Sequence, residues 1–131
     1  MPIVRKVLHT ERLVVMKTEG EVTYEDLIDS LEGIGRERAF PYRKLLDARE
    51  GRSVIRADEL DTYFALLART FRWDDFGPYA IIVGPDDGVA HDALLSRFLT
   101  MGTRPIRLFF DLAEAQDWLK SQPVPGDVFG L

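Results

Sequence analysis

The segment "KLLDAREGRSVIRADELDTYFALLARTFRWDDFGPYAIIVG", residues 44–84, decides the fold class. Its first apolar run, "KLLDA", predicts a buried strand. "RADELDTYFALLARTFRW" follows and predicts a helix, because its apolar residues recur on one face: Leu60, Tyr63, Phe64, Leu67 and Phe71. After the breaker cluster "DDFGP", "YAIIVG" is the most apolar strand of the chain. A strand, a helix and a strand in this order predict parallel pairing through a right-handed crossover.

The residues before this segment predict a hairpin and a helix. "IVRKVLH" (3–9) and "RLVVMKT" (12–18) are β-prone runs on either side of "TE", which favours two antiparallel strands. Arg5 and Lys6 suit an edge strand. "EGEV" is expected to turn into the helix, with Thr23 as its N-cap and Asp26 completing a near capping box. Its apolar stripe consists of Tyr24, Leu27, Ile28, Leu31 and Ile34.

The residues after the segment add a helix, a strand and a last helix. "PDDG" opens a helix that runs to Gly102, and "PIRLFF" (105–110) is a strand. Asp111 is the expected N-cap of the last helix, whose inner face carries Leu112, Ala115, Trp118 and Leu119. The order β-β-α-β-α-β-α-β-α predicts a single α/β domain over 1–131 with one mixed, mainly parallel five-stranded sheet, followed by an irregular tail at 122–131.

Composition limits the classes of function. The chain has 131 residues, 46% hydrophobic and 30% charged, which are values of a globular protein. It lacks cysteine and any apolar run long enough for a membrane span, and charges interrupt the N-terminal segment where a signal peptide would be apolar. We therefore expect a cytoplasmic protein. The net charge of −5 argues against broad nucleic-acid binding, so no nucleic acid is expected as a partner.

The charge is uneven along the chain. The segment from Arg36 to Arg56 contains seven basic and three acidic residues, so its formal charge is +4. The rest of the chain then has a formal charge of −9. Arg49, Arg52 and Arg56 fall where the sequence predicts a turn from strand to helix. Guanidinium groups beside a helix N-terminus suit a carboxylate or phosphate ligand, whereas the alternative is a solvated basic face paired with nearby acids. "GRSVIRAD" matches no glycine-rich phosphate loop.

Asp47 raises a second question, because receiver domains carry a phosphate-accepting aspartate at the end of their third strand. That chemistry needs a metal held by further acids, together with a hydroxyl and a lysine at the following strand ends. "VGPDD" and "LFFDL" supply neither the hydroxyl nor the lysine. Asp47 is therefore interpreted as a structural residue that accepts backbone N–H bonds in a turn.

Other reactive side chains do not form a recognisable site. His91 and Asp92 lie near Asp86 and Asp87, but neighbouring residues on a helix point in different directions, so helix capping is favoured over a metal site. No serine stands in a Gly-x-Ser-x-Gly elbow. The sequence predicts no catalytic residue, metal or cofactor, and an enzyme is only the third hypothesis.

Three aromatic residues flank the breaker "DDFGP". Trp73, Phe76 and Tyr79 are expected to be partly exposed and, with the tail "VPGDVFGL", to form a patch for a second copy, a lipid-like ligand or another protein. The alternative is that the tail covers this patch within one chain. Trp73 and Phe76, together with Asp58 at the start of the second helix, are the candidate interaction residues.

Four segments carry a family resemblance. "EGEVTYEDL", "RKLLDAREG", "YAIIVGPDDGVAHDAL" and "IRLFFDLAEAQDWL" together resemble the SpoIIAA-like family, small bacterial proteins, mostly uncharacterised and related in fold to STAS domains. The closing pattern F-D-x-x-E-A-x-x-W-L is the most specific, and the resemblance spans about Arg12 to Leu119. It implies a right-handed β-α superhelix and a binding or regulatory role.

The resemblance also implies what to look for at one turn. STAS regulators carry a phosphorylatable serine at the start of the helix after the third strand, where this chain has Ala57 and Asp58 in "RADEL". A kinase-controlled switch is therefore not expected here. Two hypotheses remain: a domain that binds a protein partner or itself, and a carrier or sensor of a small anionic or lipid-like molecule in an arginine-lined pocket.

Overall fold

A computed structural model describes residues 2–70, 76–84, 96 and 106–124. Its elements are β1 (Ile3–Leu8), β2 (Leu13–Val22), α1 (Tyr24–Arg36), β3 (Arg43–Ser53), α2 (Ala57–Thr70), β4 (Tyr79–Ile82), β5 (Ile106–Phe109) and α4 (Leu112–Lys120). The five strands form one sheet in the order β1-β2-β3-β4-β5. β1 is antiparallel to β2, and all other pairs are parallel. The predicted mixed sheet is confirmed; the helix expected within 85–102 and most of the tail lie outside the described residues.

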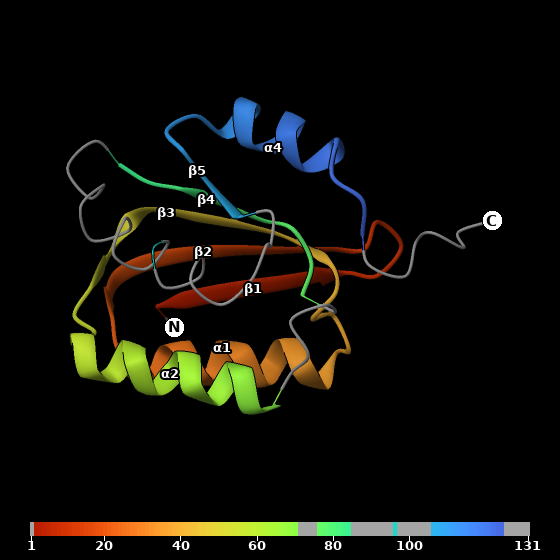
Figure 1. Ribbon diagram of the computed structural model, residues 1–131. Helices are drawn as coiled ribbons and strands as arrows, with labels where there is room; N and C mark the ends of the chain where they lie inside the picture. Colours follow the sequence, from red (N-terminus) through yellow and green to blue (C-terminus); the bar gives the residue numbers. More distant parts are fainter. Residues whose placement is uncertain (1, 71–75, 85–95, 97–105, 125–131) are drawn as a thin grey trace.

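The sheet is covered on both faces, with α1 and α2 on one side and α4 on the other (Figure 1). Because side chains alternate along a strand, each strand contributes to both layers. On the α1–α2 side the core includes Val14, Met16, Phe64, Leu67 and Ile81. On the α4 side a smaller core consists of Leu45, Ala80, Ile82, Phe109, Ala115 and Leu119.

The capping predictions are confirmed. Thr23 Oγ1 accepts a hydrogen bond from the Asp26 backbone N–H at 3.2 Å, and Asp26 Oδ2 accepts one from the Thr23 N–H at 2.8 Å. Asp111 caps α4 by accepting from the Glu114 N–H at 3.0 Å. These bonds satisfy amide groups that a helix leaves without partners in its first turn. They fix the residues at which α1 and α4 begin.

β2 and β3 are longer than the sequence predicts. The parallel ladder continues to the pair Val22↔Ser53, so "EGEV" and "REGRS" are strand rather than turn. Glycine and charged residues have low strand propensity, and here the hydrogen bonds to the neighbouring strand outweigh it. β1 pairs with β2 only as far as Thr18, and β4 pairs with β3 only as far as Asp47. The last residues of β2 and β3 therefore form a two-stranded extension of the sheet. We call this extension, residues 19–22 and 50–53, the ribbon.

A β-bulge separates the ribbon from the rest of the sheet. Lys17 pairs with Asp47 but Glu19 pairs with Glu50, so β3 has one residue more than β2 in this interval. The extra residue reverses which side chains of β3 point to each face. Residues 46 and 48 face the α1–α2 layer before the bulge, and residues 51 and 53 do so after it.

Phe76 is not a surface residue. It is 3% exposed, packs edge-on against Phe40 with ring centroids 4.9 Å apart, and stacks on Tyr79 at 6.1 Å. The Gly77 N–H donates to the Phe40 carbonyl at 3.2 Å, which holds this segment against the core. The expectation of an exposed Phe76 was wrong, because the breaker cluster leads inward to β4. Trp73 lies outside the described residues.

The same part of the core contains a buried lysine. Lys44 on β3 is 2% exposed. Its Nζ donates hydrogen bonds to the carbonyl oxygens of Phe40 and of Tyr42, the latter at 2.9 Å, and lies 4.4 Å from the centre of the Phe76 ring. Buried charges are tolerated only with such partners. Lys44 therefore ties the α1–β3 connection to the segment before β4.

Replacing this lysine tests its contribution to stability. Lys44→Met keeps the apolar stem but removes the lysine donor from the Tyr42 carbonyl and one of the two donors from the Phe40 carbonyl. We therefore expect the free energy of unfolding to fall by about 1–3 kcal/mol. Lys17→Met, on the exposed side of β2, is the control and is expected to change it by less than about 1 kcal/mol. Urea unfolding followed by circular dichroism measures both. Equal stability of Lys44→Met and the parent chain would contradict this role.

Candidate functional site

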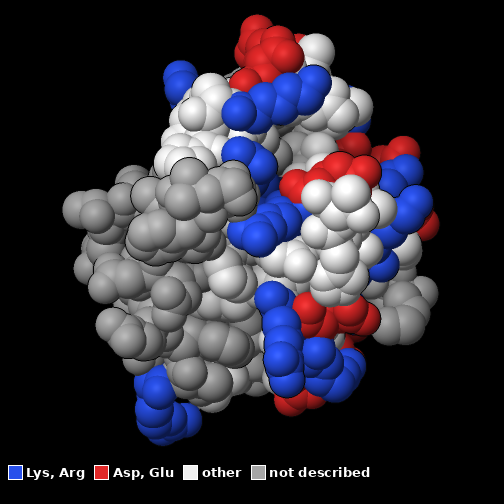
Figure 2. Space-filling view, turned by 90° about the vertical axis from the view of Figure 1, so that its right-hand side faces the viewer, with Lys and Arg blue, Asp and Glu red and all other residues white. Residues whose placement is uncertain are grey.

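The basic cluster seen in the sequence is divided by the length of β3. Arg43 begins the strand and donates through Nε and Nη2 to the Gln122 carbonyl at 2.8 and 2.6 Å. Arg49 and Arg52 lie within the second half of the strand, and Arg56 immediately precedes α2. Arg49 and Arg52 therefore lie in a strand and not in the turn that the sequence predicted, whereas Arg56 does lie in the connection between β3 and α2. On the face shown in Figure 2, basic and acidic side chains of the described residues are interspersed.

Arg49 forms an ion pair with Asp47. Its Nε and Nη2 donate to the two carboxylate oxygens of Asp47 at 2.9 and 2.7 Å, and the Arg49 backbone N–H donates to Asp47 Oδ1 at 3.2 Å. The arginine, mainly through its side-chain hydrogen bonds, lowers the pKa of the Asp47 carboxyl below its ordinary value. Asp47 thus stabilises the backbone at the bulge, although it lies inside β3 and not at a strand end.

The other two arginines also have acidic neighbours. Arg52 pairs with Glu21 across the ribbon. Arg56 Nε donates to Asp58 Oδ1 at 3.0 Å, and this pair, with Glu59 nearby, raises the Arg56 pKa. The two pairs lie at different ends of the β3–α2 link, so the arginines do not converge on one point. Their side chains are about 70% exposed, and exposed ion pairs contribute little stability and exchange partners easily.

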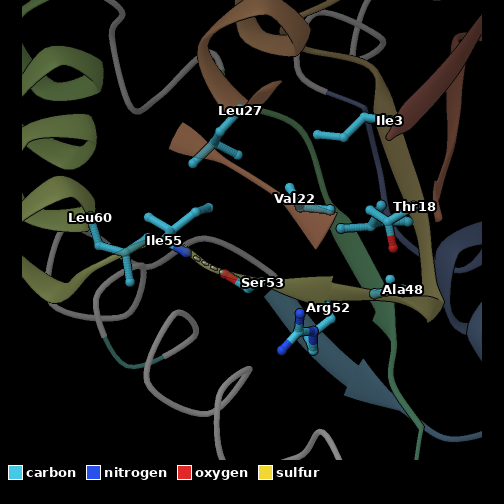
Figure 3. A pocket seen from close by; sticks show the side chains of 11 residues that line it. Ile3, Thr18, Val22, Leu27, Ala48, Arg52, Ser53, Ile55 and Leu60 are labelled. Carbon is cyan, nitrogen blue, oxygen red and sulfur yellow. Dashed lines mark hydrogen bonds between the residues drawn. The ribbon is translucent and has the colours of Figure 1, made fainter. Parts of the chain in front are cut away.

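An apolar cavity of about 90 Å³ lies beside the ribbon, between it and the first residues of α2 (Figure 3). Its apolar wall consists of Ile3, Val22, Leu27, Leu46, Ala48, Ile55 and Leu60. The cavity is at the carboxyl ends of two neighbouring parallel strands, the edge at which open α/β sheets bind their ligands. Of the three arginines predicted to hold a ligand, only Arg52 borders it.

Few polar groups line this cavity. Ser53 Oγ accepts a hydrogen bond from the Ile55 N–H at 3.3 Å, which leaves its own O–H to donate to another group (Figure 3). Thr18 and Gly51 line it farther along the ribbon. A cavity with an apolar wall, a hydroxyl and one guanidinium at its border has the composition of a site for an amphipathic small molecule.

A second hollow lies on the opposite face of the sheet, beside α4. This groove has a volume of about 610 Å³ and is floored by Leu13, Val15 and Leu45. Leu112 borders it and is 37% exposed, so the expectation that Leu112 packs inward was wrong. Three basic and two acidic side chains line the groove: Lys17, Arg43, Lys120, Glu11 and Asp47.

One polar cluster was not anticipated from the sequence. His9 Nδ1 lies 2.8 Å from the Tyr42 hydroxyl, and His9 Nε2 lies 2.8 Å from Glu37 Oε2. These residues are separated by 28 and 33 positions, so no local motif brings them together. The His9 and Glu37 side chains are about half exposed. The cluster links the β1–β2 hairpin to the residues between α1 and β3.

Two kinds of function find no support in the described part of the chain. Across residues 2–70, 76–84, 96 and 106–124, no group of three or more acidic or histidine side chains is placed to hold a metal ion. The grouping of His91 with Asp86, Asp87 and Asp92 falls outside these residues. None of the described helices is long and apolar enough to cross a membrane.

Comparison with known proteins identifies the fold. No family model matches the chain, and no curated protein matches it. A crystal structure of an uncharacterised protein from Shewanella loihica PV-4, of the DUF3478 family and with a SpoIIAA-like fold, matches with a TM-score of 0.61 over 89% of this chain and 93% of that chain. The identity is 18%. The chain therefore has a SpoIIAA-like α/β fold, as the sequence resemblance implied.

The Asp47–Arg49 pair predicts a pH dependence of stability. A carboxyl whose pKa is lower in the folded chain stabilises the fold above its ordinary value of 3.8, and this stabilisation is lost as the pH falls below that value. We expect Asp47→Asn to lower the free energy of unfolding at pH 7 by up to about 1 kcal/mol, because the pair is partly exposed.

The control is Asp117→Asn, an exposed change on α4. Urea unfolding between pH 7 and pH 2.5 should show the difference between Asp47→Asn and the parent chain shrinking with falling pH, while the control shows a smaller difference throughout. A constant difference for Asp47→Asn would refute the assignment.

Proposed function

We propose that this protein binds a small molecule with a short apolar body and an acidic head group, as a carrier or sensor. The observation that carries the proposal is the apolar cavity at the carboxyl ends of β2 and β3, which is bordered by Arg52. Phe76, expected to belong to an exposed aromatic patch, is buried. A cavity near an arginine favours a small ligand over a protein surface.

The size of the cavity limits the ligand. A volume of about 90 Å³ corresponds to roughly three waters at about 30 Å³ each, or to a similar number of methylene groups. A six-carbon acid would place about the last three carbons of its chain in the cavity, against Val22, Leu27 and Leu60, and leave the carbons next to its head group at the mouth beside Arg52. Longer chains would need the cavity to widen.

The head group would meet Arg52 and Ser53. The Arg52–Glu21 pair is exposed on both sides, so breaking it costs little and the guanidinium can turn to a ligand carboxylate. The Ser53 O–H is able to donate as well, because its oxygen accepts only the Ile55 N–H among the described residues. Arg49 and Arg56 do not border the cavity, and the proposal assigns them no contact with the ligand.

A second candidate function is contact with a protein partner or a second copy, which the likeness to STAS domains favours. The supporting observation is the groove beside α4, whose floor is apolar and whose volume is about 610 Å³. Asp58, expected to serve such a contact, is exposed and paired with Arg56 on the other side of the sheet. Light scattering of the purified chain tests self-association, and a monomer across concentrations would remove that form of the hypothesis.

Titration with hexanoate and with 1-hexanol tests the small-ligand proposal. Both compounds have the same chain, so any difference in the rise of the melting temperature reports the head group. We expect hexanoate to stabilise the protein more than hexanol. Arg52→Gln should weaken hexanoate binding by about three- to tenfold and leave hexanol binding unchanged.

Two further variants locate the site. Arg49→Gln makes the same change of charge on a residue outside the cavity, and it should bind both compounds as the parent chain does. Leu60→Trp, at a half-buried position, should fill the cavity and abolish the stabilisation by both. No stabilisation of the parent chain by hexanoate, or equal losses in Arg49→Gln and Arg52→Gln, would reject the proposal.

A further inference from the structure

Thr18 on β2 carries a hydroxyl group that the fold does not satisfy. The residue is 6% exposed, and its Oγ1 is buried without a hydrogen-bond partner among the described residues. A buried polar atom in this state destabilises a fold by about 1–3 kcal/mol. A valine at this position would have nearly the same shape as threonine and would bury no unpaired hydroxyl. Packing therefore does not explain why the residue at this position bears a hydroxyl.

The hydroxyl is held against the backbone of the opposite strand. A Cβ added to Gly51 would lie 2.1 Å from Thr18 Oγ1 and 2.5 Å from Thr18 Cβ, so only glycine fits across from this threonine. Thr18 stands at the β-bulge, where β3 has its extra residue. Both Thr18 and Gly51 line the cavity beside the ribbon. The bulge and the glycine thus place Thr18, a second hydroxyl-bearing residue besides Ser53, in the mainly apolar lining of the cavity.

We infer that Thr18 is a specificity-determining residue of this cavity and that its hydroxyl binds an oxygen atom on the chain of the ligand. The inference rests on the proposed binding of a small acid. It assigns the ligand to a narrower class, the short-chain carboxylic acids that carry an oxo or hydroxyl group. The Thr18 O–H donates to that oxygen, which gives the buried hydroxyl the partner it lacks.

The strand geometry fixes where that oxygen lies along the ligand. Ser53, at the head-group end, is two residues beyond Gly51 on the same face of β3, a separation of roughly 6–7 Å. In an extended carbon chain this distance spans about five bonds. The oxygen-bearing carbon is therefore near the far end of a six-carbon acid, as in 5-oxohexanoate.

Isothermal titration calorimetry with hexanoate and 5-oxohexanoate tests the inference. We expect the parent chain to bind 5-oxohexanoate about three- to tenfold more tightly than hexanoate, the gain of one hydrogen bond to a group otherwise left unpaired. Thr18→Val should remove this preference, with hexanoate bound at least as tightly as by the parent chain. Thr18→Ser, which keeps the hydroxyl, should retain the preference.

The outcomes separate this inference from the proposed function. Binding of hexanoate without a preference for 5-oxohexanoate, or a preference that persists in Thr18→Val, would overturn the role of Thr18 and leave the small-acid site intact. Failure of both acids to bind would overturn both. Thermal unfolding without ligand is a check on the variant itself, since Thr18→Val is expected to melt no lower than the parent chain.

Discussion

The parallel pairing of β2 with β3 is the constraint on which the rest of the structure depends. This ladder runs from Leu13↔Arg43 to Val22↔Ser53 and is longer than any other in the sheet. Because both strands end at the same edge, α1 and α2 start close together and cover the same face (Figure 1). β4 and β5 add only four residues each. The cavity lies where β2 and β3 continue beyond the ends of their pairing with β1 and β4.

One inserted residue decides which chemistry reaches this cavity. Without the bulge at Thr18, the alternation along β3 would turn Arg52 toward the α1–α2 layer and Gly51 and Ser53 away from it. The Arg52 guanidinium would then point into the apolar wall, where there is too little space for it. With the bulge, the arginine stays at the border while a glycine and a serine face inward. The chemical groups that line the cavity thus depend on strand register as well as on residue type.

The sequence predicted those features that depend on neighbouring residues. The Thr23 and Asp111 caps, the apolar stripe of α1 and the alternation of strands with helices follow from local patterns, and they are confirmed. Errors arose where a distant strand outweighs local preference. "REGRS" has the composition of a turn, yet its pairing with β2 makes it strand. Phe76 lies within a breaker cluster, yet it is buried against Phe40 and Lys44.

The candidate site was predicted less completely than the fold. The arginine-rich stretch runs past the cavity, but only Arg52 of the three chosen residues borders it. Thr18 gave no signal, since a threonine in a strand is ordinary and its missing partner is visible only in three dimensions. The same holds for the contact of His9 with Tyr42 and Glu37.

The exposed edges of the ribbon also affect how easily this part of the sheet opens. Residues 19–22 and 50–53 pair with each other and with no other strand of the described part of the chain, whereas the first halves of β2 and β3 lie inside the sheet. Segments with few neighbours open locally at a lower free energy than the whole fold requires. We therefore expect the ribbon to open locally at a lower free energy than the central strands around Lys44. A ligand of the proposed kind would then enter through such partial opening, with no hinge or domain movement.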